Sequence, residues 1–375
     1  MRVGVPSEIK VHEYRVGLTP GAVREYVAHG HQVMVQSGAG AGIMASDDAY
    51  RAAGAEIAAT AAEIFAGCDM IVKVKEPQPS EWVLLRPGQL LFTYLHLAPD
   101  PAQAKGLIAS GCTAIAYETV TDDKGTLPLL APMSEVAGRL AIEAAGEAMR
   151  RSKGGAGILL GGVPGVPAGR VTVLGGGVVG THAARMAVGL GAEVTIVDRS
   201  IPRLRQLDEL FNGRVRTRYS TLETIDHEIS IADAVIGAVL IPGASAPKLV
   251  TRAMLKHMKP GSVLVDVAID QGGCFETSHA TTHADPTYVV DGIIHYCVAN
   301  MPGAVPQTSA AALNNATLPY GLALASKGTA ALDGSTETGR GLLAGLNVHR
   351  GKVTSQAVAE SLGLDFVTPE SALAA

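Results

Sequence analysis

Four polar residues have the side chains that redox chemistry on a small amino or keto acid would need: Arg15, Lys75, His96 and Asp270. Arginine and lysine can hold a carboxylate and polarise a carbonyl group. Histidine exchanges protons near neutral pH, and an aspartate can position water or ammonia. Each residue also has a structural interpretation: surface cations, a core histidine and a turn-forming aspartate. The set therefore indicates an active site only if the fold brings its members together.

Alternating strands and helices are the elements expected to position these residues. In residues 1–128 the βαβ order predicts a mostly parallel sheet without a nucleotide-binding glycine turn. Lys75 and His96 each follow the carboxyl end of a predicted strand, where open sheets place their sites. The predicted strands are Arg2–Val5, Gln32–Gln36, Met70–Val74, Leu90–Leu95 and Thr113–Tyr117, and the predicted helices include Pro20–Ala28, Ala59–Ala66 and Pro101–Ser110.

A glycine turn marks the second part of the chain. Residues 171–180 read Val-Thr-Val-Leu-Gly-Gly-Gly-Val-Val-Gly, which predicts a strand, a tight turn and a helix. Gly175 would form the turn, Gly177 would let the backbone approach a pyrophosphate, and Gly180 would let helix and strand pack closely. The helix amino terminus would offer its N–H groups to the phosphates. The pattern indicates a dinucleotide site, with a purely structural turn as the alternative.

The choice of dinucleotide depends on Asp198, which ends the next predicted strand, 18 residues after Gly180. A carboxylate at this position can accept hydrogen bonds from both ribose hydroxyls and would repel a 2′-phosphate. This favours NAD over NADP, although the neighbouring Arg199 and Arg203 weaken the preference.

The remaining pattern completes a second doubly wound domain. Three loops that follow apolar strands, Ala238–Ile241, Asp266–Asp270 and Val298–Met301, are expected to meet the cofactor. The predicted elements are a helix at Ser134–Arg150, a glycine- and proline-rich loop at 154–169, and strands at Arg170–Leu174, Glu193–Val197, Arg214–Tyr219, Ala234–Ala238 and Ser262–Val267.

The last part of the chain is predicted to be helical, at Ser309–Lys327, Ser335–His349 and Ser355–Leu362, with no further sheet. These helices are expected to return to the first domain. The fold class is therefore α/β, with two doubly wound Rossmann-like domains separated by a cleft. Residues 1–128 and 308–375 would form the substrate domain, and the NAD domain, 129–307, would be inserted into it. Strand ends of both domains would face the cleft and bring the four polar residues together.

Composition limits the other functions. The chain has 375 residues, 47% of them hydrophobic and 17% charged, which suits a well-buried enzyme of two or three domains. A net charge of −5 without a basic tract argues against nucleic acid or an anionic membrane as partner. The four cysteines are far apart and form no CxxC pair, which favours reduced thiols and no metal site. Without a signal peptide, a cytoplasmic location is expected.

Several short motifs, at matching order and spacing over essentially the whole chain, resemble those of the NAD-dependent L-alanine dehydrogenase family. That family is related to the soluble nucleotide-binding part of proton-translocating transhydrogenase. Besides the glycine turn, the motifs are Glu8-Ile9-Lys10, residues 15–20, Val74-Lys75-Glu76-Pro77, residues 94–98, residues 132–139, residues 161–166, residues 270–274 and residues 299–303.

The resemblance implies roles for individual residues. Arg15 and Lys75 would bind the substrate carboxylate and carbonyl, His96 would be the general acid and base, and Asp270 would be its catalytic partner. The glycine turn and the three loops together give the full set expected at the cofactor, with Ser134, Val178, Arg203 and Ser220 supplied by resemblance. That set is Ser134, Gly175, Gly177, Val178, Gly180, Asp198, Arg203, Ser220, Val239, Leu240, Val267, Ala268, Ile269, Asp270, Val298, Ala299, Asn300 and Met301.

The activity implied by the resemblance is reversible oxidative deamination of L-alanine to pyruvate, ammonia and NADH. Two alternatives remain at this point: a nucleotide-binding subunit of a transhydrogenase, which would need membrane-spanning partners, and a catalytically silent NAD-binding protein. The intact polar set favours the dehydrogenase. The resemblance also implies a homohexamer, and the low charge content fits buried subunit faces.

Overall fold

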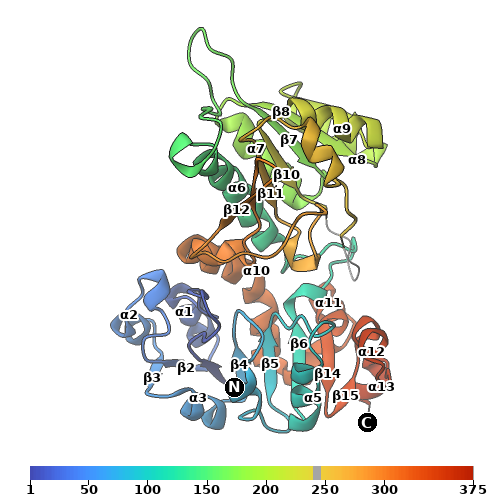
Figure 1. The fold of residues 1–375 in the computed structure, drawn as a ribbon. Coiled ribbons are helices and arrows are strands. Elements are labelled where there is room, and N and C mark those ends of the chain that lie inside the picture. The colour runs from blue at the N-terminus through green and yellow to red at the C-terminus, as the bar shows by residue number, and fades with distance from the viewer. Residues whose placement is uncertain (240–245, 375) are drawn as a thin grey trace. The chain divides into compact units, whose positions relative to one another are not determined.

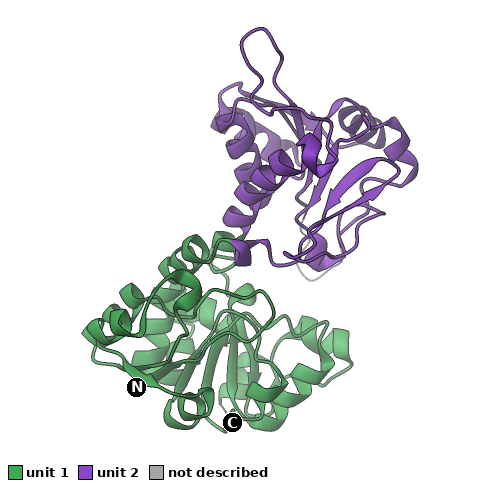
Figure 2. Cartoon of the chain, turned by 60° about the vertical axis from the view of Figure 1, so that its left-hand side comes forward, with its two compact units in different colours: residues 1–133, 305–375 green, residues 134–304 purple. Residues whose placement is uncertain are grey.

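The computed structural model describes residues 1–239 and 246–374. Its internal contacts divide the chain into two compact units, coloured separately in Figure 2. Unit 1 is discontinuous and consists of Met1–Met133 and Val305–Ala375, whereas unit 2 is the continuous segment Ser134–Ala304. The sequence pattern predicts the corresponding junctions at 128/129 and 307/308.

Unit 1 is built on a sheet in the order β15-β14-β6-β5-β4-β1-β2-β3 (Figure 1). Strands β1 to β6 pair in parallel, and β14 and β15 add an antiparallel edge beside β6. Strands β4, β5 and β6 are buried along their whole length, as is typical of parallel strands covered on both faces. The bounds are Arg2–Val5 (β1), Gln32–Gln36 (β2), Glu56–Ala58 (β3), Met70–Val72 (β4), Leu90–Thr93 (β5), Thr113–Ala116 (β6), Leu346–His349 (β14) and Lys352–Val353 (β15).

Polar residues define where the helices of unit 1 begin. The side chains of Thr19, Ser46, Thr60 and Asp100 each accept a hydrogen bond from a backbone N–H in the first turn of the helix that follows. The helices are α1 (Pro20–Ala28), α2 (Asp47–Ala52), α3 (Ala61–Gly67), α4 (Pro79–Trp82), α5 (Pro101–Ser110), α10 (Pro306–Lys327), α11 (Glu337–Gly345), α12 (Gln356–Leu362) and α13 (Pro369–Leu373).

Unit 2 has a second sheet in the order β12-β13-β11-β10-β7-β8-β9, parallel except for β12. Its strands are Arg170–Leu174 (β7), Glu193–Asp198 (β8), Val215–Tyr219 (β9), Ala234–Gly237 (β10), Val263–Asp266 (β11), Thr287–Val290 (β12) and Ile293–Tyr296 (β13). Its helices are α7 (Val178–Gly189), α8 (Ile201–Phe211) and α9 (Leu222–Ile231), together with most of α6 (Ala131–Ala148). Both units are thus α/β, as the sequence pattern predicts.

Two helix predictions differ from the structure. The predicted helix Ser335–His349 is wrong in its last turn, because Leu346–His349 forms β14 and pairs with β6. All four of these residues are buried. Their apolar and polar side chains alternate as in a strand, but the segment is only four residues long and directly continues a helical pattern. The helix predicted from Ser134 begins at Ala131 instead, since Pro132 is well tolerated in a first helical turn.

Candidate active site

The candidate catalytic residues of unit 1 follow neighbouring parallel strands. Strands β1, β4, β5 and β6 lie side by side, so their carboxyl ends share one edge of the sheet. The loops and turns that follow them contain Arg15, Lys75, His96 and Glu118, respectively. The first three of these residues are thus brought to one edge by topology, as the sequence pattern predicts for Lys75 and His96. Asp270 belongs to unit 2.

Arg15 is held by a buried ion pair. Its side chain is 2% exposed, and its Nε and Nη2 atoms donate to the Glu13 carboxylate at 2.6 and 2.5 Å. The Arg15 backbone N–H binds the same carboxylate at 3.0 Å. Burial alone would lower the pKa of Arg15, but Glu13 more than offsets this and raises it. The guanidinium therefore stays charged in a fixed orientation, as carboxylate recognition requires.

The loop that contains Arg15 is fixed to α10. Asn314 accepts a hydrogen bond from the Thr19 backbone N–H at 2.6 Å and donates to the Gly17 carbonyl at 2.8 Å. Gly17 packs directly on β4, where a Cβ atom would lie 2.4 Å from the Val72 carbonyl oxygen. Glycine is therefore required at this contact.

Lys75 follows a buried charge network at the end of β4. The Lys73 ammonium group contacts Glu8 at 3.1 Å and Glu81 at 2.9 Å, and all three side chains are at most 3% exposed. Burial alone would lower the pKa of Lys73, but Glu8 and Glu81 raise it above its usual value. The Glu8 carboxylate also accepts the backbone N–H groups of Val74 at 2.7 Å and Lys75 at 3.4 Å. The backbone that leads to the Lys75 side chain is thus fixed from inside the sheet.

His96 has an unusual backbone conformation, which Glu118 supports. Its φ angle is +48°, in the left-handed region that residues with side chains rarely adopt. The Glu118 carboxylate accepts the His96 backbone N–H at 2.6 Å and the Leu95 N–H at 3.2 Å. The imidazole is 44% exposed and stacks on the Tyr94 ring at a centroid distance of 5.8 Å. Such strain is typical of functional positions, and here two hydrogen bonds stabilise it.

The glycine turn of unit 2 has the local structure that dinucleotide binding requires. Gly175 has a φ of +101°, and a Cβ atom on Gly180 would lie 1.8 Å from the Gly175 carbonyl oxygen. Gly177 precedes α7 as its N-cap, and a Cβ there would meet no described atom within 4 Å. Packing of the protein itself therefore explains Gly175 and Gly180 but does not explain Gly177. Gly177 stands at the amino terminus of α7, where free backbone N–H groups can bind a phosphate.

Asp198 lies at the end of β8 and faces this turn. Its two carboxylate oxygens accept the backbone N–H groups of Gly176 and Ser200, both at 2.7 Å. Arg203 also contacts the turn, because its Nε donates to the Gly176 carbonyl oxygen at 2.7 Å and its Nη2 to the Thr181 hydroxyl at 2.7 Å. Asp198 and Arg203 therefore shape the turn, and each Asp198 oxygen retains a lone pair for a ligand hydroxyl.

Asp270 is the exposed residue of a 3₁₀ turn, Ile269–Gln271, that follows β11. The buried side chain of Asp266 organises this loop by accepting the N–H groups of Ala268 at 3.2 Å and Cys274 at 2.8 Å. The Ser278 hydroxyl donates to the same carboxyl group at 2.5 Å. Burial raises the pKa of Asp266, although these hydrogen bonds oppose that shift.

The other residues expected at the cofactor mostly lie at the carboxyl edge of the second sheet. Val178 begins α7, Ser220 follows β9, Val239 follows β10, Val267, Ala268 and Ile269 follow β11, and Val298, Ala299, Asn300 and Met301 follow β13. Ser134, which resemblance places at the cofactor, lies inside α6. Leu240 lies outside the described residues.

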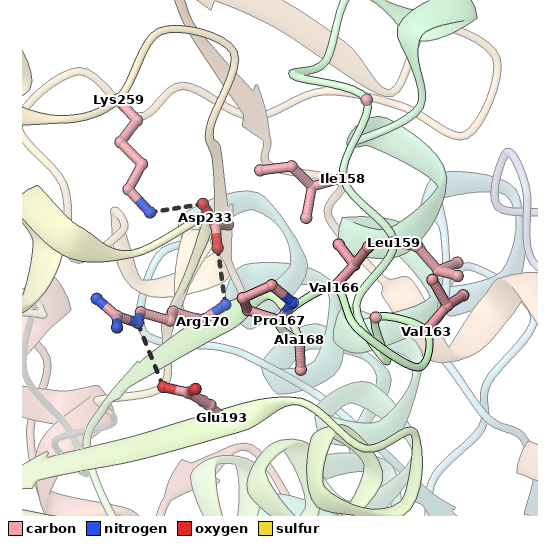
Figure 3. Close-up of a pocket in the computed structure, with 12 residues that line it drawn as sticks. Ile158, Leu159, Val163, Val166, Pro167, Ala168, Arg170, Glu193, Asp233 and Lys259 are labelled. Carbon is pink, nitrogen blue, oxygen red and sulfur yellow. Dashed lines mark hydrogen bonds and ion pairs between the residues drawn. The ribbon is translucent and has the colours of Figure 1, made fainter.

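A cavity of about 490 Å³ lies elsewhere in unit 2 (Figure 3). Its walls include Arg170 and Glu193, the first residues of β7 and β8, together with Asp233, which precedes β10. These positions mark the amino ends of the strands, opposite the glycine turn. The cavity is therefore separate from the expected dinucleotide site.

Metal sites and membrane-spanning helices are two further kinds of feature that bear on function. Among residues 1–239 and 246–374, no cluster of histidine, cysteine, aspartate or glutamate side chains has an arrangement suited to a metal ion. No helix in the described part of the chain combines the length and apolar character needed to cross a membrane.

From the sequence, no individual role was predicted for five carboxylates near the polar set, although two stand in the quoted motifs and one begins an expected cofactor loop: Glu8, Glu13, Glu76, Glu118 and Asp266. A positional signal was present for some of them. Glu118 follows β6 just as Lys75 and His96 follow β4 and β5, and Glu76 is adjacent to Lys75. Glu8 and Glu13 precede the reactive positions in loops, where a glutamate is ordinarily exposed to solvent.

Comparisons with known proteins cover both units. The family models "Alanine dehydrogenase/PNT, N-terminal domain" and "Alanine dehydrogenase/PNT, C-terminal domain" match residues 4–137 and 141–356. An alanine dehydrogenase of Halomonas elongata is 58% identical over 371 residues, covering 99% of each chain. An alanine dehydrogenase of Bacillus subtilis is 55% identical over 375 residues, covering 100% of this chain and 98% of the relative.

Solved structures agree with these matches. An L-alanine dehydrogenase superposes with a TM-score of 0.93 at 50% identity, covering 97% of this chain and 99% of the other. A transhydrogenase from Sinorhizobium meliloti gives a TM-score of 0.80 at 27% identity, covering 95% and 100%. Because sequence and structure match across both units, the chain belongs to the alanine dehydrogenase/PNT family.

Proposed function

We propose that the chain catalyses the reversible, NAD-dependent oxidative deamination of L-alanine to pyruvate and ammonia. The observation that carries this proposal is the position of Arg15, Lys75 and His96 at the carboxyl edge of one sheet, after the adjacent strands β1, β4 and β5. Two cations and a histidine at one edge provide carboxylate binding, carbonyl polarisation and proton transfer. The full-length relatives that are named alanine dehydrogenase support the same activity.

In this proposal, unit 1 is the substrate domain. Arg15 would bind the substrate carboxylate, since its guanidinium is charged and fixed by Glu13. Lys75 would polarise the carbonyl oxygen of pyruvate. His96 would accept a proton as water adds during deamination and would return it in the reverse direction. Asp270 would orient the attacking water or ammonia.

Unit 2 is the proposed NAD domain. The amino terminus of α7 at Gly177 would bind the pyrophosphate, and Asp198 would bind the adenosine ribose. Bound NAD would supply the redox chemistry by accepting a hydride from the alanine Cα. The protein's contribution is to position the two reactants and to move protons.

The transhydrogenase alternative has weaker support. The matched transhydrogenase is 27% identical, whereas the alanine dehydrogenases are 55% and 58% identical over nearly the whole chain. The polar set at the edge of the first sheet also argues against a catalytically silent protein.

One assay tests the function and separates the dehydrogenase from both alternatives. Purified protein is mixed with L-alanine and NAD at alkaline pH, and NADH formation is followed by absorbance. A dehydrogenase forms NADH in proportion to enzyme. A transhydrogenase subunit or a silent protein binds NADH but forms none from alanine, and that result would refute the proposal.

We further propose that the enzyme is a cytoplasmic homohexamer. Leu159, Val163 and Val166 are 66%, 53% and 59% exposed around a narrow hairpin in unit 2, which the Val163–Val166 bridge closes. Exposed apolar side chains gathered in this way favour a subunit contact. Sedimentation of the wild-type protein and of a Val163→Asp, Val166→Asp variant tests this proposal. A wild-type monomer would refute it.

A further inference from the structure

Glu76 lies beside the imidazole of His96, and one of its carboxylate oxygens accepts no hydrogen bond from the described residues. Its side chain is 11% exposed, and Oε1 forms an ion pair with Lys10. The other oxygen, Oε2, is buried and has no hydrogen-bond partner among the residues that the structure describes. This oxygen is 3.8 Å from His96 Nδ1. Since an unpartnered buried carboxylate oxygen is unfavourable, a small rotation that brings Nδ1–H within hydrogen-bond distance would be stabilising.

Several other groups surround His96 and influence its pKa or its orientation. Glu118 binds its backbone and contributes negative charge, Lys75 contributes positive charge, and the Tyr94 ring stacks on the imidazole. Burial alone would lower the pKa of His96, but Glu118 and Glu76 outweigh both burial and Lys75, so the pKa is raised.

The same contacts keep Glu76 ionised. Burial by itself would raise the pKa of Glu76, but His96 and Lys10 lower it to about 2. A carboxyl group with so low a pKa does not take the imidazole proton near neutral pH. It acts on the histidine as a fixed negative charge.

We propose that Glu76 is the positioning residue of His96, which holds the ring through Nδ1 and stabilises the protonated imidazole during the reaction. Nδ1 then keeps its proton throughout, and Nε2 exchanges a proton with the substrate. No proton passes to Glu76, whose role matches that of the orienting carboxylate in a hydrolase triad. This inference rests on the proposed function, in which His96 is the acid and base.

Substitution of Lys10 should change the pKa of His96 in the direction opposite to substitution of Glu76. Its ammonium group competes with His96 for the Glu76 carboxylate. Removing the Lys10 charge should therefore strengthen the action of Glu76 on the imidazole, whereas Glu76→Gln should abolish it. A purely structural role for Glu76 predicts that Glu76→Gln leaves the titration of His96 unchanged.

The experiment measures the titration of His96 directly. Hydrogen–deuterium exchange at the imidazole C2 position, followed by peptide mass spectrometry against pH, gives the midpoint for each histidine in the full-length protein. Glu76→Gln should lower the His96 midpoint by about one pH unit, at the low end of the roughly 1–3 units typical of a close opposite charge, because the imidazole is partly exposed. Glu76→Asp should give an intermediate value, and Lys10→Met should raise the midpoint.

Glu25→Gln is the matched control, because it removes the same charge from an exposed position on α1 and should leave the midpoint unchanged. The pH profile of kcat/KM for pyruvate should move in parallel with each midpoint. A midpoint within about 0.2 units of wild type in both Glu76→Gln and Lys10→Met would overturn the proposal. Should Glu76→Gln not fold, Glu76→Asp decides, because it keeps the negative charge but moves it away from the imidazole and should lower the midpoint.

The exchange measurement also separates this inference from the proposed function. If wild-type protein forms no NADH from alanine while Glu76→Gln still lowers the midpoint, the activity assignment fails and the contact stands. If alanine is oxidised and the midpoint does not move, the inference about Glu76 alone fails.

Discussion

Two glycines of one turn give a matched pair of substitutions with opposite expected results. A Cβ on Gly180 would lie 1.8 Å from the Gly175 carbonyl oxygen, whereas a Cβ on Gly177 would meet no described atom within 4 Å. Gly180→Ala should therefore damage the fold, and Gly177→Ala should damage only dinucleotide binding.

The magnitudes follow from these distances. The overlap at Gly180 is with backbone, so helix and turn must separate, and overpacking of this kind costs about 1–3 kcal/mol. At roughly 2–4 °C per kcal/mol for a domain of this size, Gly180→Ala should lower Tm by roughly 2–12 °C. Gly177 has φ −68° and ψ −159°, which alanine also adopts, so Gly177→Ala should change stability by less than about 1 kcal/mol.

NADH binding should respond in the opposite way. A methyl group at Gly177 would occupy the space expected for the pyrophosphate and weaken its charge-assisted hydrogen bonds, each worth about 1.5–3 kcal/mol. NADH should therefore bind Gly177→Ala roughly 10- to 100-fold more weakly. At a concentration 100 times the wild-type Kd, NADH stabilises wild type by about 2.7 kcal/mol and a variant with tenfold weaker binding by about 1.4 kcal/mol.

Thermal melts with and without NADH, together with a fluorescence titration, measure both effects. Wild-type affinity in Gly177→Ala would refute the placement of the pyrophosphate. An unchanged Tm in Gly180→Ala would refute the steric argument.

Three further substitutions test other parts of the site. Asp198→Ser should relax the preference for NAD toward NADP, since the carboxylate that repels a 2′-phosphate is removed; kcat/KM with each cofactor measures this, and equal wild-type efficiency with both would refute it. Glu13→Ala should destabilise unit 1 by about 3–5 kcal/mol, because it removes the carboxylate from a buried ion pair with Arg15, and an unchanged melt would contradict this. His96→Ala and Asp270→Asn should each lose about 10²–10⁴-fold in kcat while binding NADH normally, and a variant that keeps a tenth of wild-type kcat would lose its catalytic assignment.

The parallel strands and the glycine turn could be predicted because their signals are local. Strands such as Arg2–Val5 and Arg170–Leu174 have the predicted bounds, since each is a short apolar run that ends at a turn. Strand β14 could not be found in this way, because it pairs with β6, more than 200 residues earlier in the chain. Its residues, Leu346-Asn347-Val348-His349, do alternate apolar and polar side chains, but this strand signal is only four residues long and directly continues a helical pattern.

The sequence predicts a site residue only where a reactive side chain follows directly after a predicted strand. Lys75 and His96 meet both conditions, so topology places them as predicted. Glu13 and Glu8 do not, because a glutamate in a loop usually faces solvent and only packing shows that these two are buried. The left-handed backbone of His96 could not be predicted either, since it is supported by a contact with Glu118, 22 residues later in the chain.

Three buried or half-buried carboxylates of unit 1 share one arrangement. Glu13 holds the Arg15 guanidinium, Glu8 holds the backbone before Lys75, and Glu118 holds the backbone of His96. Stability alone does not explain such groups, because well-packed apolar residues stabilise a core as well as or better than buried ion pairs do. Each carboxylate instead fixes a loop that the parallel strands leave unsupported at their carboxyl ends. The buried charges are therefore best explained by the positions that they give to the three reactive side chains.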